Sequence, residues 1–128
     1  MSISPKTTEI TGVDDPSWLG SAHGLDSTET ITLDPALFDA ETHYPDGYLP
    51  SGLNLAKVTA TSLYGPYDNA ATDGREVFAG HLVAPRPVDG QPRIVAAALT
   101  HGKVRAANLP ISLDAAGKAD AAGRIRYI

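Results

Sequence analysis

The stretch of residues 44–68 constrains the fold more than any other part of the chain. Two turn signals, Pro45-Asp46-Gly47 and Pro50-Ser51-Gly52, each place a proline shortly before a glycine. Proline fixes the backbone of the second turn position, and glycine accepts the angles that close the turn. Side chains then alternate over residues 53–60, which predicts a strand. We expect Gly65-Pro66 to stop the short run that follows, so this stretch predicts a compact β-structure.

The size of the chain fits one domain, or one domain with an arm. Its 128 residues are enough to bury about two-thirds of the surface of the unfolded chain. Cysteine is absent, which excludes disulfides and zinc-cysteine sites. The first residues are polar, and no apolar run approaches the roughly 20 residues that span a bilayer. We therefore expect a soluble protein that is made in the cytoplasm and makes no membrane contact.

Charge is unevenly placed along the chain. Residues 1–46 hold nine acids and one lysine, a net charge of −8, whereas residues 47–128 hold nine Lys/Arg and six acids, a net charge of +3. The basic part is too weakly and diffusely charged for nucleic-acid binding. This asymmetry predicts either a protein partner or a tail that folds against the body.

The first 27 residues predict a flexible N-terminal arm, and residues 28–128 a β-rich domain. The arm has few apolar side chains, so it cannot bury enough area to offset the entropy of ordering it alone. It nevertheless carries the one tryptophan, Trp18, followed by Leu19. Two interpretations stay open for Trp18: it folds back to cover the open edge of the body, or it anchors a partner.

The rest of the chain predicts a mainly β fold with little helix. Strands are predicted near residues 28–33, 76–83, 94–100, 103–105 and 124–128, and the first and last of these alternate. Phe78, Gly80 and Leu82 should share one face of the second of these, and both of its faces are apolar, as in a small barrel or sandwich. Asp34 and Pro35 predict one short helical turn. Ser112 should cap a C-terminal helix over residues 113–122 that ends at Gly123.

No catalytic or metal site is predicted. The four histidines, His23, His43, His81 and His101, are not paired at a ligand spacing, and no nucleophile or phosphate-binding motif is present. We therefore expect no enzyme activity, no metal and no cofactor. An alternative is a small hydrolase whose site, around His81, His101 and Asp68, is shared between subunits.

The order of motifs over most of the chain resembles the head decoration (capsid cement) proteins of tailed phages, the group typified by that of phage lambda. The resemblance rests on these pieces: Trp18-Leu19-Gly20-Ser21, His23-Gly24, Thr32-Leu33-Asp34, Phe38, His43-Tyr44-Pro45-Asp46-Gly47-Tyr48, Pro50-Ser51-Gly52-Leu53, Tyr64-Gly65-Pro66-Tyr67-Asp68, Asp73-Gly74, Ala79-Gly80, His101-Gly102-Lys103-Val104 and Leu109-Pro110. It implies a small β-tulip-like barrel that binds as a homotrimer to the major capsid protein. The trimers would lie at three-fold or quasi-three-fold sites on the outside of an expanded icosahedral head, in the virion, without catalysis.

This resemblance suggests roles for particular residues. Ile10, Trp18 and Leu19 are the candidate capsid anchors of the arm, which could add a strand to an exposed sheet edge. Small side chains let another backbone come close, so the candidate trimer contacts are Gly80, Ala96, Ala97 and Ala98.

A trimeric β-domain on a phage fibre or surface that binds carbohydrate is the alternative function. Exposed aromatic side chains line such sites, and Tyr44, Tyr48, Tyr64 and Tyr67 are available for one.

Overall fold

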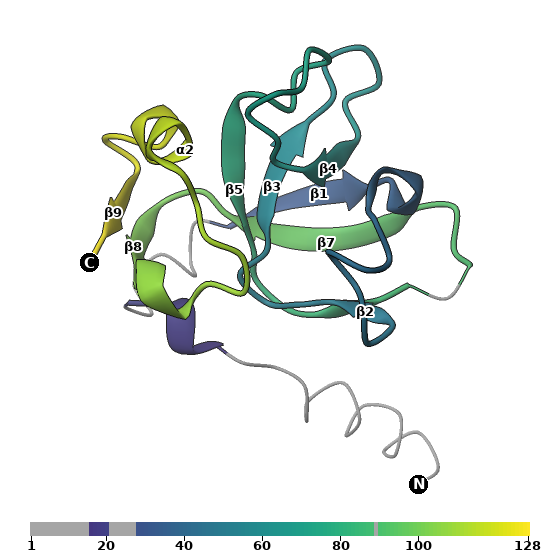
Figure 1. Cartoon of the computed structure of the whole chain (residues 1–128), viewed down its shortest axis with the longest axis horizontal. Helices are drawn as coiled ribbons and strands as arrows, with labels where there is room; N and C mark the ends of the chain where they lie inside the picture. Colours follow the sequence, from purple (N-terminus) through teal and green to yellow (C-terminus); the bar gives the residue numbers. More distant parts are fainter. Residues whose placement is uncertain (1–15, 21–27, 89) are drawn as a thin grey trace, which may run out of the picture.

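A closed five-stranded barrel forms the centre of the molecule (Figure 1). The computed structural model describes residues 16–20, 28–88 and 90–128. The strands follow each other around the barrel in the order β1-β4-β3-β5-β7, and β1 closes it by pairing with β7 on one side and β4 on the other. Their bounds are Glu29–Leu33 (β1), Asn54–Lys57 (β3), Tyr64–Pro66 (β4), Phe78–Leu82 (β5) and Ile94–Leu99 (β7). The prediction of a mainly β, barrel-like body is therefore confirmed.

Smaller elements cover the barrel. Two short strands, β2 (Tyr48–Leu49) and β6 (Arg86–Pro87), pair with each other, and β8 (Gly102–Val104) pairs in parallel with β9 (Ile125–Tyr127). Helix α2 spans Ala115–Asp120, and the 3-10 turns are η1 (Pro16–Trp18), η3 (Pro35–Leu37) and η4 (Ala106–Asn108). In Figure 1, α2, β8 and β9 lie together at one end of the molecule, away from η3. Within the described residues no helix is long and apolar enough to cross a membrane.

Two hydrophobic clusters stabilise this arrangement. The first fills the barrel and includes Leu33, Leu55 and Leu82. The second includes Phe78 of β5, and it also holds residues of β8, β9 and the segment Leu113–Ala121. Strand β5 is thus covered on both faces, as its apolar sequence predicts.

One face assignment in β5 is wrong. Alternation from residue 76 places Phe78 and Leu82 on one face, but they lie in different clusters. The register between β3 and β5 shifts between Leu55 and Ala56, so that Leu55 faces Gly80 while Ala56 faces Phe78. This β-bulge on β5 reverses the alternation at that point.

Turn and cap predictions fare unevenly. Asp34 caps η3, accepting a hydrogen bond of 3.0 Å from the N–H of Ala36, as expected. Helix α2 is capped by Asp114 rather than Ser112, because the Asp114 carboxylate accepts from Gly117 N–H at 2.8 Å. The segment Gly65-Pro66 lies within β4, which ends at Pro66. Pro66 pairs with Leu55 of β3 and with no residue of a second strand. The missing N–H of proline therefore leaves no hydrogen bond to a second strand unmade.

Candidate functional site: the docked Trp18 segment

The segment Pro16–Gly20 is attached to the C-terminal elements by main-chain hydrogen bonds. Pro16 opens the turn η1, a position where its missing N–H costs nothing. Leu19 then forms an antiparallel bridge with Val104 of β8. Gly20 N–H donates to the Lys103 carbonyl at 2.8 Å, and Arg105 N–H donates to the Trp18 carbonyl at 2.6 Å. This short segment therefore extends the edge of β8.

The indole of Trp18 fills a slot inside the chain's own fold, with 1% of the residue exposed. Its Nε1–H donates to Ser51 Oγ at 2.8 Å, and that hydroxyl donates to the Val83 carbonyl at 2.7 Å. Gly52 forms the wall of the slot: a Cβ added there would lie 2.8 Å from the indole, and its φ is +89°. The predicted turn Pro50-Ser51-Gly52 is thus also the receptor for the tryptophan.

His81 closes the slot from the β5 side and is fully buried. Its ring lies 5.6 Å from that of Trp18 and 4.9 Å from that of Phe78, between centroids. Its Nδ1 is 3.1 Å from the Gly52 carbonyl, and its Nε2 is 2.9 Å from the hydroxyl of Tyr127. A neutral ring satisfies both atoms, since Nδ1–H donates to the carbonyl and Nε2 accepts from the phenol.

Burial fixes the protonation states in this network. Removal from water lowers the pKa of His81 from 6.5 to about 4, only partly opposed by its hydrogen bond to Gly52. Burial likewise raises the pKa of Tyr127 well above its ordinary value, although Arg124 opposes the change. Near neutral pH the imidazole is uncharged and the phenol keeps its proton. The network therefore holds the Trp18 contact with uncharged groups.

The predicted partner anchors have different outcomes. Ile10 lies outside the described residues, as do His23 and most of the predicted arm. In this conformation Trp18 is not exposed as a surface anchor, because its N–H and its ring are both used inside the chain. The other interpretation of Trp18, that it folds back onto the body, matches the structure. Leu19 is half-buried and packs against the second cluster.

The predicted trimer contacts are mostly buried. Ala96 and Ala98 point into the barrel and belong to its core, because alternate residues of β7 face inward. A Cβ at Gly80 would lie 2.6 Å from the Leu99 carbonyl, so this glycine serves the pairing of β5 with β7. These three residues are buried in this fold and offer no exposed contact surface. Ala97 alone points outward and is half-buried.

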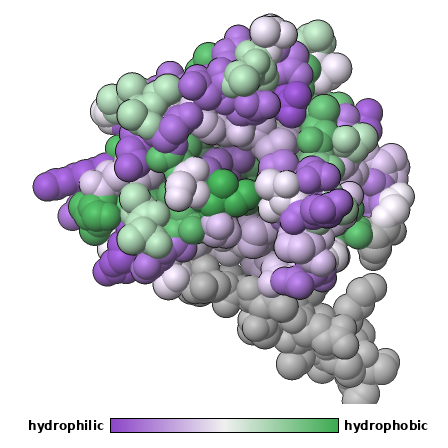
Figure 2. Space-filling view, in the orientation of Figure 1, coloured by the Kyte–Doolittle hydropathy of each residue, from purple (hydrophilic) through white to green (hydrophobic). Residues whose placement is uncertain are grey.

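The outer face of the β1–β7 ladder is uncharged. Val95, 63% exposed, lies opposite Thr32, and Ala97 lies opposite Thr30. Figure 2 shows that hydrophobic residues on the viewed side of the molecule form small groups separated by polar ones.

The residues of the alternative hydrolase site share no hydrogen bond or ring contact in the described part of the chain. His81 is engaged as above, whereas the ring of His101 lies in an exposed turn with Nδ1 3.1 Å from Thr100 Oγ1. Asp68 accepts from the N–H of Ala70 in its own loop. Within residues 16–20, 28–88 and 90–128, no group of three His, Asp or Glu side chains could hold a metal ion.

Sequence reasoning missed Ser51, Gly52, His81 and Tyr127 as the receptor of Trp18. One available signal was a lone tryptophan in an otherwise polar segment, since a buried indole N–H needs an acceptor.

A scan against protein-family models, a search of curated proteins and a search of solved structures each found no match.

Proposed function

We propose that the chain is a structural decoration (cement) protein of a tailed-phage head. It binds as a homotrimer to the major capsid protein on the outside of the expanded icosahedral shell and resists separation of the capsid subunits. The role involves no catalysis, no cofactor, and no contact with nucleic acid or membrane. The proposal rests on the ordered motifs that resemble those of capsid cement proteins.

The observation that supports it is the convergence of those motifs at one place. Trp18 of the first motif lies in the slot made by Ser51 and Gly52 of another. In a third motif, Val104 forms the bridge to Leu19, and the carbonyl of its neighbour Lys103 accepts from the docked segment. Pro110 of a fourth would lie 3.0 Å from a Cβ at Gly52. Motif pieces far apart in sequence therefore act as one structural unit.

The Trp18 slot changes the mechanism that the sequence suggested. Trp18 attaches the N-terminal arm to the barrel of its own chain. We therefore assign the capsid contact to residues 1–15 of the arm, with Ile10 as the apolar anchor. A fixed attachment at Pro16 lowers the entropy lost when these residues bind a shell. Three arms on one trimer raise avidity by about 100-fold or more when all can bind the shell together.

Cosedimentation with expanded heads that have been stripped of their own decoration protein tests this proposal. A variant lacking residues 1–15 keeps Trp18 in its slot, whereas a longer deletion through Trp18 would open the core. We expect this variant to keep its oligomeric mass and its melting temperature but to lose at least about tenfold in head binding. Ile10→Ser should reproduce much of the loss, and Thr7→Ser serves as the matched control. Equal decoration by the shortened chain would show that residues 1–15 do not make the capsid contact. Failure of the full chain to bind heads would refute the proposed function.

One observation favours the carbohydrate alternative. A groove of about 460 Å³ lies beside η3, and its lining includes the ring of Tyr44, the planar polar groups of Asp34 and Arg93, and Gln91. Aromatic faces beside planar hydrogen-bonding groups suit sugar rings. Another of the tyrosines has a structural role, since Tyr67 donates to Asp114 at 2.8 Å. A glycan array with the full chain and with Tyr44→Ala tests this groove: loss of a specific signal on substitution would favour the alternative.

A further inference from the structure

Three cations form a basic face on the C-terminal strands. Lys103 of β8 and Arg126 of β9 are directly paired in the parallel ladder, so their side chains leave the same side of the sheet about 4.8 Å apart. Arg105 directly follows β8, and its guanidinium donates to the Leu19 carbonyl of the docked segment at 3.0 Å. All three are exposed. We call Lys103, Arg105 and Arg126 the C-terminal basic face.

This face is not neutralised within the described part of the chain. The two ion pairs there are Arg75–Asp73 and Arg93–Asp34, and neither involves the basic face. The acids nearest in sequence are used elsewhere: Asp114 caps α2, and Asp120 accepts from Phe78 N–H at 3.0 Å. Like charges placed side by side across a ladder repel each other. An anionic surface docked here would remove that repulsion.

The loop between η3 and β2 has the opposite character. Asp39, Glu41 and Asp46 are exposed, and residues 34–49 contain no lysine or arginine. Asp39 accepts from the Thr42 side chain at 2.7 Å, whereas the side chains of Glu41 and Asp46 make no ion pair with the described residues. We call Asp39, Glu41 and Asp46 the acidic loop.

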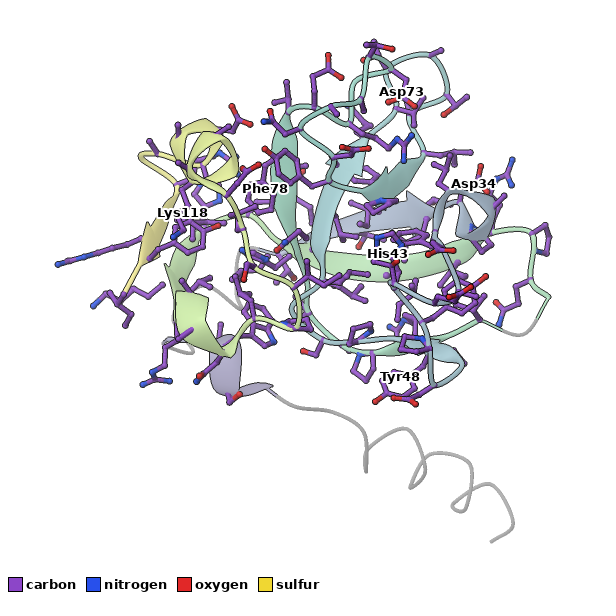
Figure 3. All side chains as sticks on the ribbon, viewed as in Figure 1. Asp34, His43, Tyr48, Asp73, Phe78 and Lys118 are labelled. Carbon is purple, nitrogen blue, oxygen red and sulfur yellow. The ribbon has the colours of Figure 1, made fainter. Side chains whose placement is uncertain are left out.

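The two charged surfaces lie on different elements of the fold. In Figure 1, β8 and β9 lie at the left, and in Figure 3 the labelled Asp34, next to η3, lies towards the right, with the labelled His43 of the loop before β2 nearer the middle. We therefore expect that one copy does not bring its own basic face to its own acidic loop. A second copy can, because each carries the complement of the other's free surface.

We propose that the C-terminal basic face of one copy binds the acidic loop of the next, head to tail, and that three such contacts close the trimer. This inference rests on the homotrimer in the proposed function, and it names the two surfaces that would hold it. A contact between two different surfaces closes into a three-membered ring when each step rotates by 120°. Ile128, exposed next to the basic face, offers an apolar contact at the same interface.

Charge reversal tests the contact without any capsid. Sedimentation equilibrium at 50 mM salt should show trimers of the full chain, and 500 mM salt should weaken them because exposed charges are screened. K103E/R126E and E41K/D46K should each weaken association by about tenfold or more, and the quadruple variant should restore it. K57E reverses an exposed charge on β3, outside both surfaces, and should have no effect. Trimers that ignore both reversals, or a full chain that stays monomeric at 50 mM salt, would overturn the proposal.

A covalent trap gives a second readout should the quadruple variant fold poorly. The chain has no cysteine, so E41C/R126C introduces the two thiols that are available for pairing. They lie on separate elements of one copy, the loop before β2 and strand β9, so we expect them to pair between copies. Non-reducing electrophoresis should show covalent trimers, and monomers alone would contradict the contact. Retention of the full chain, but not K103E/R126E, on a 20-base-pair DNA duplex would also contradict it.

The head-binding assay separates this inference from the proposed function. Trimers that follow the charge pattern but leave heads bare would refute the capsid role and keep the contact. Decorated heads together with trimers that are insensitive to charge reversal would support the capsid role and refute the contact.

Discussion

The buried imidazole of His81 should make folding stability depend on pH in a defined window. Its pKa is about 4 in the folded chain against 6.5 in the unfolded one, because burial disfavours the charged ring. Between these values the unfolded chain binds the extra proton, so stability is present above pH 6.5 and is lost as pH falls towards 4. A difference of about 2.5 pKa units at 1.36 kcal/mol each corresponds to about 3 kcal/mol.

Urea unfolding followed by Trp18 fluorescence measures this directly. The free energy of unfolding should fall by about 3 kcal/mol between pH 7.5 and pH 4, with a slope near 1.4 kcal/mol per pH unit around pH 5. His43 acts in the same direction, since burial also lowers its pKa, so the experiment is best done on a His43→Gln background. The lowered pKa values of Asp39 and Asp73 act below their ordinary value of 3.8, outside this window.

His81→Gln provides the control for the pH profile. It costs stability at every pH because the slot is repacked, but the slope between pH 6.5 and 4 should disappear. A slope that survives in His81→Gln, or a parent chain whose stability is flat across the window, would refute the reasoning that places a neutral imidazole in this slot.

Two further predictions concern the slot. Trp18→Ala should destabilise the fold by about 3–5 kcal/mol in urea unfolding, and native Trp18 emission should be blue-shifted and insensitive to iodide; a red, quenchable emission would contradict the burial. Gly52→Ala should cost more than about 2 kcal/mol because its φ is positive and its Cβ meets the indole, whereas Gly47→Ala, at a similar φ in open space, should cost about 1 kcal/mol; equal costs would show that the indole contact contributes nothing.

The sequence carries the local signals of this fold well. Strands β1 and β3 follow from alternation, β5 and β7 follow from short apolar runs, and η3 follows from Asp34 and Pro35, because these features depend on neighbouring residues alone. Ser112 and Asp114 are both good caps, and the choice between them depends on where α2 packs. A preference shared by two nearby residues cannot be resolved locally.

Other features depend on contacts that sequence spacing does not encode. Trp18 meets Ser51 across 33 positions, so its receptor could not be found by periodicity. The run Ala96-Ala97-Ala98 has no polar member to mark its outer face, and only pairing with β1 shows that Ala97 points outward. The bulge opposite Leu55 and Ala56 reverses which faces the following side chains of β5 occupy, and no proline or local charge in the sequence signals it.

The capsid role is tested most directly by an electron cryomicroscopy reconstruction of expanded, stripped heads incubated with the full chain. The account predicts a knob of three barrels at three-fold or quasi-three-fold sites, with density from each Pro16 leading to the underlying capsid protein. Heads that stay bare at micromolar concentrations of the chain, or that carry single barrels away from these axes, would contradict it.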